Sequence, residues 1–532
     1  MGKIGIHGTM AADIPLALED LHEKVRTIVK GVFGAIVIDS ATTYFVGGAS
    51  VHGILFVSSQ LVSPLLIDAV VVDESFVAER YAEAIEAACG RFGISLDTQV
   101  TCIMGDNAYI NDKIARLLNI TLAKCIAHSL NLVSQDLTAE FQHCEDVTTV
   151  LVGIISAGGS KIRAKELKAL GIKISAITAY KNRWSSIVAA AKYMMSPSDN
   201  NNHISNYEVI KEWFLKRCES AAKKAEKSVA RKVPSNLEHG SKHATKTARK
   251  CPQVIAEETE MKPLPKRTDE CGIEKGILTN AVCARLKNAF STPTSMVELC
   301  IVCMLHEDIP ALIKMASGNG DAVDASFLDA VKSLGISLES TAKLSRARLL
   351  VTECMTECHI QSEKTQSVHA MFTNKVINAA KAGYAKFLTH TSIACDLLQQ
   401  RFRFDQRRHP VPLDLEPFDE LSPETIKKFF GCLKEDAGFR LVKEYDDYVA
   451  TYPLLTIEEK SMSPSQFWKS KLDKYKILSK LGMWWAEVPT SSVAIERVFG
   501  VMRAMEDPQR CNLTVDNFKA ELFFKINKAV LR

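Results

Sequence analysis

The sequence predicts an α/β fold that combines a mixed β-sheet with a large helical part. Three apolar runs rich in Val, Ile and Leu follow one another closely, which is typical of short buried strands: 35–38, 51–57 and 65–72. Residues 76–92 change to helical spacing, and 100–104 return to a strand pattern. The chain has 532 residues, of which 47% are hydrophobic, so it can bury a large core and form about three domains.

The order of these elements indicates how the sheet is connected. A helix near 107–118, a short strand near 122–126 and a helix that begins near His128 follow the fourth strand. Strands in direct succession pair antiparallel, whereas strands joined through helices pair parallel, so we expect a mixed sheet. Beyond this part the spacing is mostly helical up to about residue 480, as in 326–334 and 376–398.

Composition divides the chain into five parts. Between Lys211 and Lys250 twelve Lys or Arg stand against four Glu, with few residues suited to a core, so we expect a flexible basic segment there. The expected parts are an N-terminal leader (1–33), the first part of the sheet domain (34–190), the basic segment (191–275), a helical insertion domain (276–460) and a C-terminal region that completes the sheet domain (461–532).

Charge and cysteine content exclude several classes of protein. The net charge of +4 permits an anionic partner without requiring one. Fifteen cysteines without framework spacing are typical of reduced intracellular thiols and not of a secreted disulfide scaffold. The first ten residues lack a secretory signal pattern, and no run of apolar residues is long enough to span a bilayer. We therefore expect no membrane partner.

Two carboxylates stand where apolar strands end. Asp39 closes the first strand and Asp106 follows the fourth, so the two side chains meet if those strands are neighbours. Burial of a carboxylate costs on the order of several kcal/mol unless a partner or a cation compensates its charge. The alternative is that each Asp caps the turn or helix after its strand.

A motif around the second acid carries a family resemblance. Gly105-Asp106-Asn107-Ala108 is followed about twenty residues later by Cys125-Ile126-Ala127-His128-Ser129-Leu130-Asn131-Leu132. This pairing resembles the core of the hAT superfamily of cut-and-paste DNA transposases. Cys125 and His128 could instead be half of a zinc site, but no second pair of ligands lies at finger-like spacing, which favours a structural or substrate-contacting His128.

A second motif, Arg183-Trp184-Ser185-Ser186, is similar to the family's Arg-Trp-Asn-Ser phrase, with Ser185 in place of the usual Asn. The resemblance implies that Trp184 stacks on an unpaired base and that Arg183 and His128 also contact DNA. A tryptophan packed in a helical core is the alternative.

The C-terminal motif is the most specific. Val488-Pro489-Thr490-Ser491-Ser492-Val493-Ala494-Ile495-Glu496-Arg497-Val498-Phe499 resembles the hAT C-terminal dimerisation region, in which the third acidic residue follows a Ser. Glu496 matches that acid. Helical spacing places it at the edge of an apolar stripe, from which it could reach a cleft; a solvated helical Glu is the alternative.

The resemblance implies an RNase-H-like sheet interrupted by an α-helical domain, in which Asp39, Asp106 and Glu496 converge. Such acids would bind Mg²⁺ (or Mn²⁺) for DNA cleavage and strand transfer in the nucleus. A homo-oligomer is also implied. The C-terminal helix, 517–531, has an apolar stripe of Phe518, Leu522, Phe523 and Ile526 that must pack either on its own domain or on a second subunit.

The sequence also departs from the family's pattern. Ala41 stands where Trp is usual after the first acid, Gly105 replaces Thr or Ser, and Ile495 replaces Ser, although none of these removes a ligand. We expect no N-terminal BED-type zinc finger, because about 33 residues precede the first strand. A catalytically inactive domesticated DNA-binding or dimerisation protein is one alternative, and an unrelated helical scaffold is another.

One further motif, Cys300-Ile301-Val302-Cys303, has a spacing that is known from redox and metal sites. Its apolar neighbours favour two buried cysteines in a helix.

Overall fold

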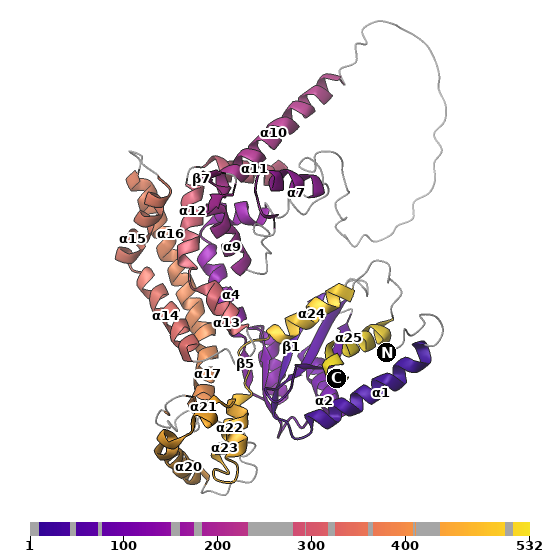
Figure 1. Ribbon diagram of the computed structural model, residues 1–532. Coiled ribbons are helices and arrows are strands. Elements are labelled where there is room, and N and C mark those ends of the chain that lie inside the picture. Colours follow the sequence, from indigo (N-terminus) through magenta and orange to yellow (C-terminus); the bar gives the residue numbers. More distant parts are fainter. Residues whose placement is uncertain are drawn as a thin grey trace, which may run out of the picture. The chain divides into compact units, whose positions relative to one another are not determined.

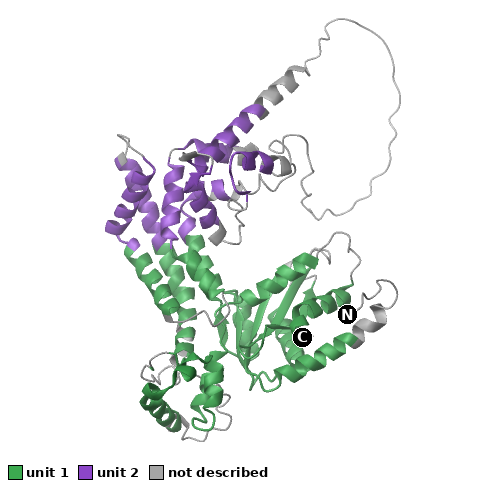
Figure 2. Cartoon of the chain, in the orientation of Figure 1, with its two compact units in different colours: residues 1–136, 308–340, 381–532 green, residues 137–307, 341–380 purple. Residues whose placement is uncertain are grey.

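The structure is a computed structural model, which divides into two compact units (Figure 2). Unit 1 comprises residues 1–136, 308–340 and 381–532, and unit 2 comprises 137–307 and 341–380. The structure describes residues 10–42, 49–72, 77–150, 160–174, 184–199, 201–231, 280–292, 294–317, 325–359, 365–407, 410, 437–505 and 514–531. The two units are described separately below.

A five-stranded mixed sheet forms the centre of unit 1 (Figure 1). Its strand order is β3-β2-β1-β4-β5, with antiparallel pairing of β1 with β2 and β2 with β3, and parallel pairing of β1 with β4 and β4 with β5. The strands are β1 (Gly34–Thr42), β2 (Ser50–Val57), β3 (Leu65–Val72), β4 (Val100–Gly105) and β5 (Leu122–Lys124). The α/β fold class with a mixed sheet and many helices, predicted from sequence, is confirmed.

The strands form where the apolar runs occur because both faces of the sheet are covered. Ala35 to Ile38 in β1 are fully buried, and every residue of β4 is buried. Continuous apolar runs are typical of strands covered on both faces. The sheet therefore forms a core rather than a surface layer.

Five helices pack in this part of unit 1. Helix α24 contacts β1 and β2, whereas α25 contacts β3, α24 and α1 (Figure 1). The bounds are α1 (Met10–Val29), α2 (Ala78–Phe92), α3 (Tyr109–Leu117), α24 (Val493–Met505) and α25 (Val515–Asn527), followed by the short helix η6 (Lys528–Leu531). Segments from both ends of the chain thus cover one sheet.

Helix α1 lies in the stretch for which the sequence predicted only a leader. Leu21, Val25 and Val29 are fully buried along one side of it, and the ring of His22 packs against the aromatic rings of Phe92 and Phe523. The repeat of four residues explains why this stretch is helical, since it places these side chains on one face.

The apolar stripe of α25 is turned inward. Phe518, Leu522 and Phe523 are buried within unit 1. The side chain of Asn527 donates to the carbonyl of Leu66 at 2.8 Å and accepts from its N–H at 2.9 Å, which satisfies backbone groups of the edge strand β3. Of the two possible partners for this stripe, its own domain is therefore the one observed.

The remaining helices of unit 1 include a bundle rich in aromatic residues. Trp468 is fully buried against Tyr448 and Phe467, and its Nε1 donates to the carbonyl of Phe404. The elements outside the sheet are α13 (Ile309–Ala316), α14 (Ala325–Thr341), η3 (Phe387–Ser392), α17 (Ile393–Arg403), α20 (Ala437–Thr451), η4 (Tyr452–Leu454), α21 (Ile457–Ser461), α22 (Pro464–Ser470) and α23 (Leu478–Ala486).

Unit 2 is helical and has its own core. Phe214 and Phe290 pack at a centroid distance of 5.4 Å within it, and the buried carboxylate of Glu298 pairs with Lys375 at 2.8 Å. Its elements are the end of α4 (Ile126–Thr138), α5 (Gln142–Glu145), η1 (Asp146–Val150), α7 (Ser160–Ala169), α9 (Trp184–Met195), the hairpin β6 (Pro197–Ser198) and β7 (Asn201–Ser205), α10 (Asn206–Arg231), α11 (Asn280–Ser291), α12 (Ser295–Leu305), α15 (Leu344–Glu357) and most of α16 (Thr365–Lys386).

Helix α10 differs from the prediction of a flexible basic segment over 191–275. Tyr207, Ile210, Trp213 and Phe214 are buried on one side of it, so its first turns join the core despite the many Lys and Arg of the segment. The rest of the segment, from residue 232 to 275, lies outside the described residues.

No single described helix is long and apolar enough to cross a membrane, and only α11 and α12 taken together, bent by 85°, meet that test by length and composition.

A glycine allows α23 to approach Trp468 closely. A Cβ at Gly482 would lie 2.5 Å from atoms of the indole ring, which itself is fixed by its hydrogen bond to Phe404. We expect Gly482→Ala to lower the free energy of unfolding by about 1–3 kcal/mol through overpacking. Gly500→Ala, in helix α24 with no atom within 4 Å of the added methyl, should raise it by about 0.5–1 kcal/mol. Urea unfolding followed by circular dichroism compares both, and equal stability of the Gly482 variant and the parent would contradict this packing.

Candidate active site

Asp39 lies on the central strand of the sheet. It is half-buried, follows the four fully buried residues of β1, and its Oδ1 accepts from the backbone N–H of Ser40 at 2.7 Å. Its partner across the antiparallel pair is Gly53 of β2. Directly opposed residues of an antiparallel pair project to the same face of a sheet, so the face that Gly53 leaves open is the one to which Asp39 points.

Asp106 follows the parallel neighbour of that strand. Val37 of β1 pairs with Met104 of β4, and each acid comes two residues after this pair, so both stand at the same end of the sheet. The Oδ1 of Asp106 accepts from the Nδ2 of Asn111 at 2.7 Å and from the N–H of Ala108 at 3.0 Å. The second bond is the turn-capping bond that the sequence offered as the alternative reading, and both bonds leave the carboxylate fixed in position.

Gly105 permits the approach of Asn111. A Cβ at Gly105 would lie 2.7 Å from the Nδ2 of Asn111, the same atom that donates to Asp106. The departure from Thr or Ser at this position therefore has a local reason in this chain. No pattern in the sequence pointed to Asn111, because a buried amide on a short helix has many structural roles.

Glu496 is brought to the sheet by the close packing of α24. A Cβ added at Gly53, the residue that pairs with Asp39, would lie only 2.8 Å from the Cδ1 of Ile495. Ile495, Val498, Phe499 and Met502 form the buried stripe predicted from sequence, while Glu496 itself is exposed. Glu496 is therefore adjacent in sequence to Ile495. Ile495 packs against Gly53, and Gly53 is the residue paired with Asp39.

The electrostatics of Asp39 report that the three acids are near one another. The pKa of Asp39 is raised to about 7: burial is the largest cause, the charges of Asp106 and Glu496 add to it, and the hydrogen bond from Ser40 opposes it. Burial also raises the pKa of Tyr81 well above its ordinary value, with the charges of Asp39 and Asp106 as further causes. The Tyr81 hydroxyl donates to the carbonyl of Gly53 at 3.1 Å. The two strands and α24 therefore concentrate negative charge at one place.

The donor set fits a hard divalent cation in chemistry and charge. Carboxylate oxygens are the ligands that Mg²⁺ and Mn²⁺ prefer, and a cation would relieve the repulsion that raises the pKa of Asp39. As they are placed, however, no three His, Cys, Asp or Glu side chains among the described residues form a group that could hold a metal ion. The charges of Asp106 and Glu496 therefore act on Asp39, but the three carboxylates do not form a coordination shell as they are placed.

Cys125 joins the two motifs that lie farthest apart in the sequence. Its Sγ accepts from the N–H of Ser492 at 3.3 Å and from the N–H of His128 at 3.4 Å. The N–H of Ile126 donates to the carbonyl of Thr490 at 3.3 Å. Burial raises the pKa of the Cys125 thiol. A neutral, buried thiol that accepts backbone hydrogen bonds is structural, and its role here is to fix the beginning of α24.

A recess of about 260 Å³ adjoins that end of α24. Its lining combines backbone and hydroxyl groups with Arg401, Arg497 and Glu487. Arg401 donates to the carbonyl of Val488 at 2.7 Å, Arg497 donates to the carbonyl of Ser317 at 3.2 Å, and the buried Glu487 accepts from the N–H of Ser59 at 2.6 Å. Two cationic groups therefore line this recess together with the acid Glu487, and the sequence did not single out Arg401.

Of the residues expected to contact DNA, the structure describes the side chain of His128 only. His128 lies half-buried in α4, near the beginning of that helix. Trp184 is the first residue of α9 in unit 2, but its side chain and the whole of Arg183 lie outside the described residues. The expected stacking of Trp184 on a base stays a prediction.

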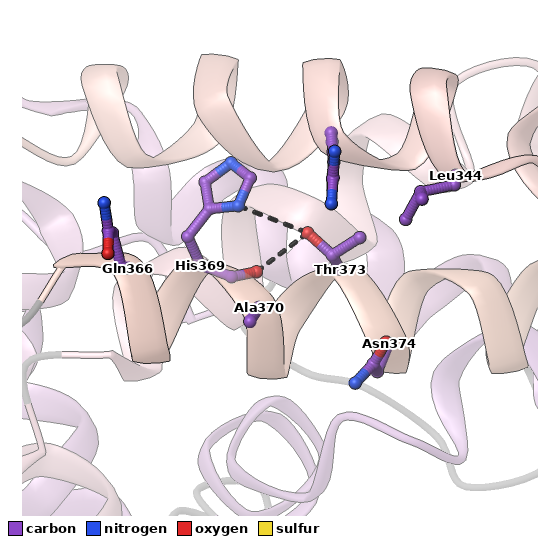
Figure 3. A pocket seen from close by; sticks show the side chains of 7 residues that line it. Leu344, Gln366, His369, Ala370, Thr373 and Asn374 are labelled. Carbon is purple, nitrogen blue, oxygen red and sulfur yellow. Dashed lines mark hydrogen bonds between the residues drawn. The ribbon is translucent and has the colours of Figure 1, made fainter.

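A second recess lies in unit 2 between α15 and α16 (Figure 3). It has a volume of about 350 Å³, and His369 within it contacts the hydroxyl groups of Thr352 and Thr373 at 3.0 and 3.3 Å. Its lining consists of Leu344, Arg348, Gln366, His369, Ala370, Thr373 and Asn374. With no carboxylate in this lining, the recess lacks the chemistry of the acidic site.

Comparison with known families agrees with the C-terminal motif. Residues 444–527 match the family model described as the hAT family C-terminal dimerisation region. No curated protein matches the chain. The match supports an hAT-family transposase-like protein, which is a dimerising class. It covers Glu496 but neither Asp39 nor Asp106, so the resemblance around those two residues rests on their own motifs.

The raised pKa of Asp39 predicts a pH dependence of stability. In the unfolded chain its pKa returns to about 3.8, so the native state holds the extra proton between about pH 4 and 7. The free energy of unfolding should therefore fall as pH rises through this window and level off above it. Asp39→Asn should remove this component and raise stability at pH 8 by about 2–4 kcal/mol.

Thermal unfolding measured between pH 4 and 8 checks this expectation. Glu86→Gln, an exposed acid of α2, serves as the control and should keep the profile of the parent. A parallel profile for Asp39→Asn and the parent would show that Asp39 does not carry the proton.

Proposed function

We propose that this protein is a hAT-type transposase-derived protein with a metal-dependent core for DNA cleavage and strand transfer. The observation that carries the proposal is the shared field of Asp39, Asp106 and Glu496, which come from two neighbouring strands and one helix far along the chain. Burial is the largest cause of the raised pKa of Asp39, and the charges of Asp106 and Glu496 add to it. That arrangement is favourable only when a cation or a proton is bound.

Each acid would have a distinct part in holding Mg²⁺ or Mn²⁺. Asp106 is oriented by Asn111 and Ala108, Asp39 stands on the central strand of the sheet, and Glu496 is an exposed residue in the first turn of α24. When bound, the metal would supply Lewis-acid activation of water or of a 3′-hydroxyl for attack on a phosphodiester. The protein's own contribution is to position the acids and the substrate.

DNA is the partner that this chemistry requires. The recess beside α24 presents Arg401 and Arg497 within the same unit as the acids, where guanidinium groups could contact the phosphate backbone. His128, Arg183 and Trp184 are the further contacts proposed from the family resemblance, and action on chromosomal DNA would place the protein in the nucleus.

A catalytically inactive DNA-binding or dimerisation protein is the second candidate function. One observation favours it: the described acidic groups do not form a metal-coordinating group as they are placed. In this case the three acids would still be present but would bind no metal ion and catalyse no reaction.

The first candidate predicts that Asp106→Asn abolishes nicking. With purified full-length chain, supercoiled plasmid and Mg²⁺ or Mn²⁺, the rate should fall at least about a hundredfold, because an amide is a poor ligand for a hard cation. Glu86→Gln should leave the rate unchanged. A parent chain that binds DNA but never nicks it would favour the inactive protein, and full activity of the Asp106 variant would place the chemistry elsewhere.

The dimer that the C-terminal region implies needs a surface other than the stripe of α25. Among the described residues of 444–527, the most exposed large apolar side chains are Leu454 and Ile457, at 79% and 89% exposure. We propose that they lie in the contact between two copies, since exposed apolar side chains gain most from burial at an interface.

Leu454→Asp combined with Ile457→Asp should convert the dimer into a folded monomer, because it would place two charges in an apolar contact. Analytical ultracentrifugation measures the change. Val62→Asp is the matched control: Val62 is 98% exposed but lies outside the matched region, so this variant should remain dimeric. A dimer in the double variant would move the interface to another surface.

A further inference from the structure

Two helices of unit 2 bring four cysteines together. Cys300 and Cys303 lie one turn apart on α12, and Cys354 lies on α15, with Cys358 at its C-terminal cap. The two helices contact each other within unit 2. The buried helical position predicted for the Cys300-x-x-Cys303 motif is confirmed for Cys300. No local pattern in the sequence connects this motif with Cys354 and Cys358, which follow about fifty residues later.

Contacts between side chains place the cysteines of α12 against the last turns of α15. The Sγ of Cys300 lies 3.2 Å from a carboxylate oxygen of Glu357, the residue before Cys358, and the Sγ of Cys354 lies 3.2 Å from the Sδ of Met304 on α12. Cys354 and Cys358 are also the two side chains that most strongly shift the pKa of Cys300. Cys300 is therefore placed next to the end of α15 that carries both other thiols.

The members of the cluster differ in acidity and in access. Hydrogen bonds from Cys354 and Cys358 lower the pKa of Cys300, and the same contacts raise the pKa values of both neighbours. Cys354 is fully buried, whereas Cys358 is partly exposed. The Cys300 thiol is thus the more acidic of the three, and of its two neighbours Cys358 is the one that solvent can reach.

Cys358 is also better placed than Cys354 to move. It caps α15, and the next residue, His359, has a φ of 52°, so the helix has ended by this point. A shift of Cys358 toward Cys300 therefore breaks no turn inside the helix. Cys354 lies within the helix, where a similar shift would disturb its hydrogen bonds.

Metal binding is the competing use of such a cluster. Tetrahedral sites for Zn²⁺ are commonly formed from four thiolates. No group of three or more cysteines in the described part of the chain is placed so that it could hold a metal ion. A disulfide needs only one pair of thiols at a suitable distance.

We propose that this cluster is an oxidation site, in which hydrogen peroxide converts the thiols of Cys300 and Cys358 into a disulfide that joins α12 to α15. The Cys300 thiolate attacks one oxygen of the peroxide; the O–O bond breaks, the S–O bond of a sulfenic acid forms, and hydroxide leaves and takes up a proton as water. The sulfur of Cys358 then attacks the Cys300 sulfur, the S–S bond forms, the S–O bond breaks, and a second water departs with the Cys358 proton. Two thiols lose two electrons, and one peroxide is reduced to two waters.

The test uses the reduced, full-length chain. After treatment with hydrogen peroxide, free thiols are blocked with N-ethylmaleimide, the chain is digested without reductant, and cross-linked peptides are mapped by mass spectrometry. We expect a peptide pair joined through Cys300 and Cys358 that dithiothreitol separates. Before the link forms, dimedone should trap sulfenic acid at Cys300 at least about tenfold faster than at Cys218, a partly exposed cysteine of α10 in the same unit.

Three variants separate the steps. Cys358→Ser should abolish the cross-link and let the sulfenic acid accumulate at Cys300, whereas Cys300→Ser should abolish both products. Cys218→Ser should behave like the parent. Circular dichroism establishes that each variant is folded, and the Cys358 variant keeps the first step measurable if the Cys300 variant is unstable.

Three results would overturn the proposal. These are a link from Cys300 to Cys354, equal oxidation of Cys300 and Cys218, and a stoichiometric zinc ion that stays with the reduced chain through dialysis against a weak chelator. The last would identify the thiols as metal ligands. None of these outcomes depends on the acidic site, so failure here leaves the proposed DNA chemistry untouched.

Discussion

The close packing of helix α24 against strand β2 is the contact on which the candidate active site depends. Gly53 leaves room for Ile495, because a Cβ added there would lie 2.8 Å from the Cδ1 of that side chain, which would have to shift. The hydrogen bonds from Ser492 to Cys125 and from Ile126 to Thr490 hold the beginning of the same helix. Without this packing Glu496 would be an ordinary exposed acid, and the sheet would carry two acids instead of three.

This packing has an electrostatic cost that the fold does not remove. Burial raises the pKa of Asp39, the charges of Asp106 and Glu496 add to this rise, and the hydrogen bond from Ser40 compensates only part of it. Asn111 and Ala108 instead fix Asp106, so the repulsion cannot be relieved by rotation of that side chain. Local instability of this kind is typical of functional sites, where a ligand supplies the missing compensation.

The C-terminal region has a structural role within its own unit, in addition to the dimerisation for which its family is described. Helix α25 buries its aromatic side chains within unit 1, and Asn527 completes the hydrogen bonding of Leu66 on the edge strand β3. An edge strand satisfied in this way offers fewer free backbone groups for pairing with a second chain. The region therefore completes the sheet domain in addition to any contact it makes between copies.

The sequence by itself determined the fold class, because the order of apolar runs and helical spacings already implies a mixed sheet with many helices. It also singled out the C-terminal motif, since Glu496 and its apolar neighbours lie within one helix. Motifs of this kind depend on local spacing, which a sequence displays directly.

Only the tertiary structure decided which distant groups lie together. Asn111 beside Asp106, the thiol of Cys125 beneath Ser492, and the cysteines of α12 beside those of α15 are contacts between segments that no local pattern connects. The burial of helix α1 and of the first turns of α10 likewise depends on the surfaces that cover them. Such contacts are set by packing among many side chains at once, and local spacing carries no information about the partner.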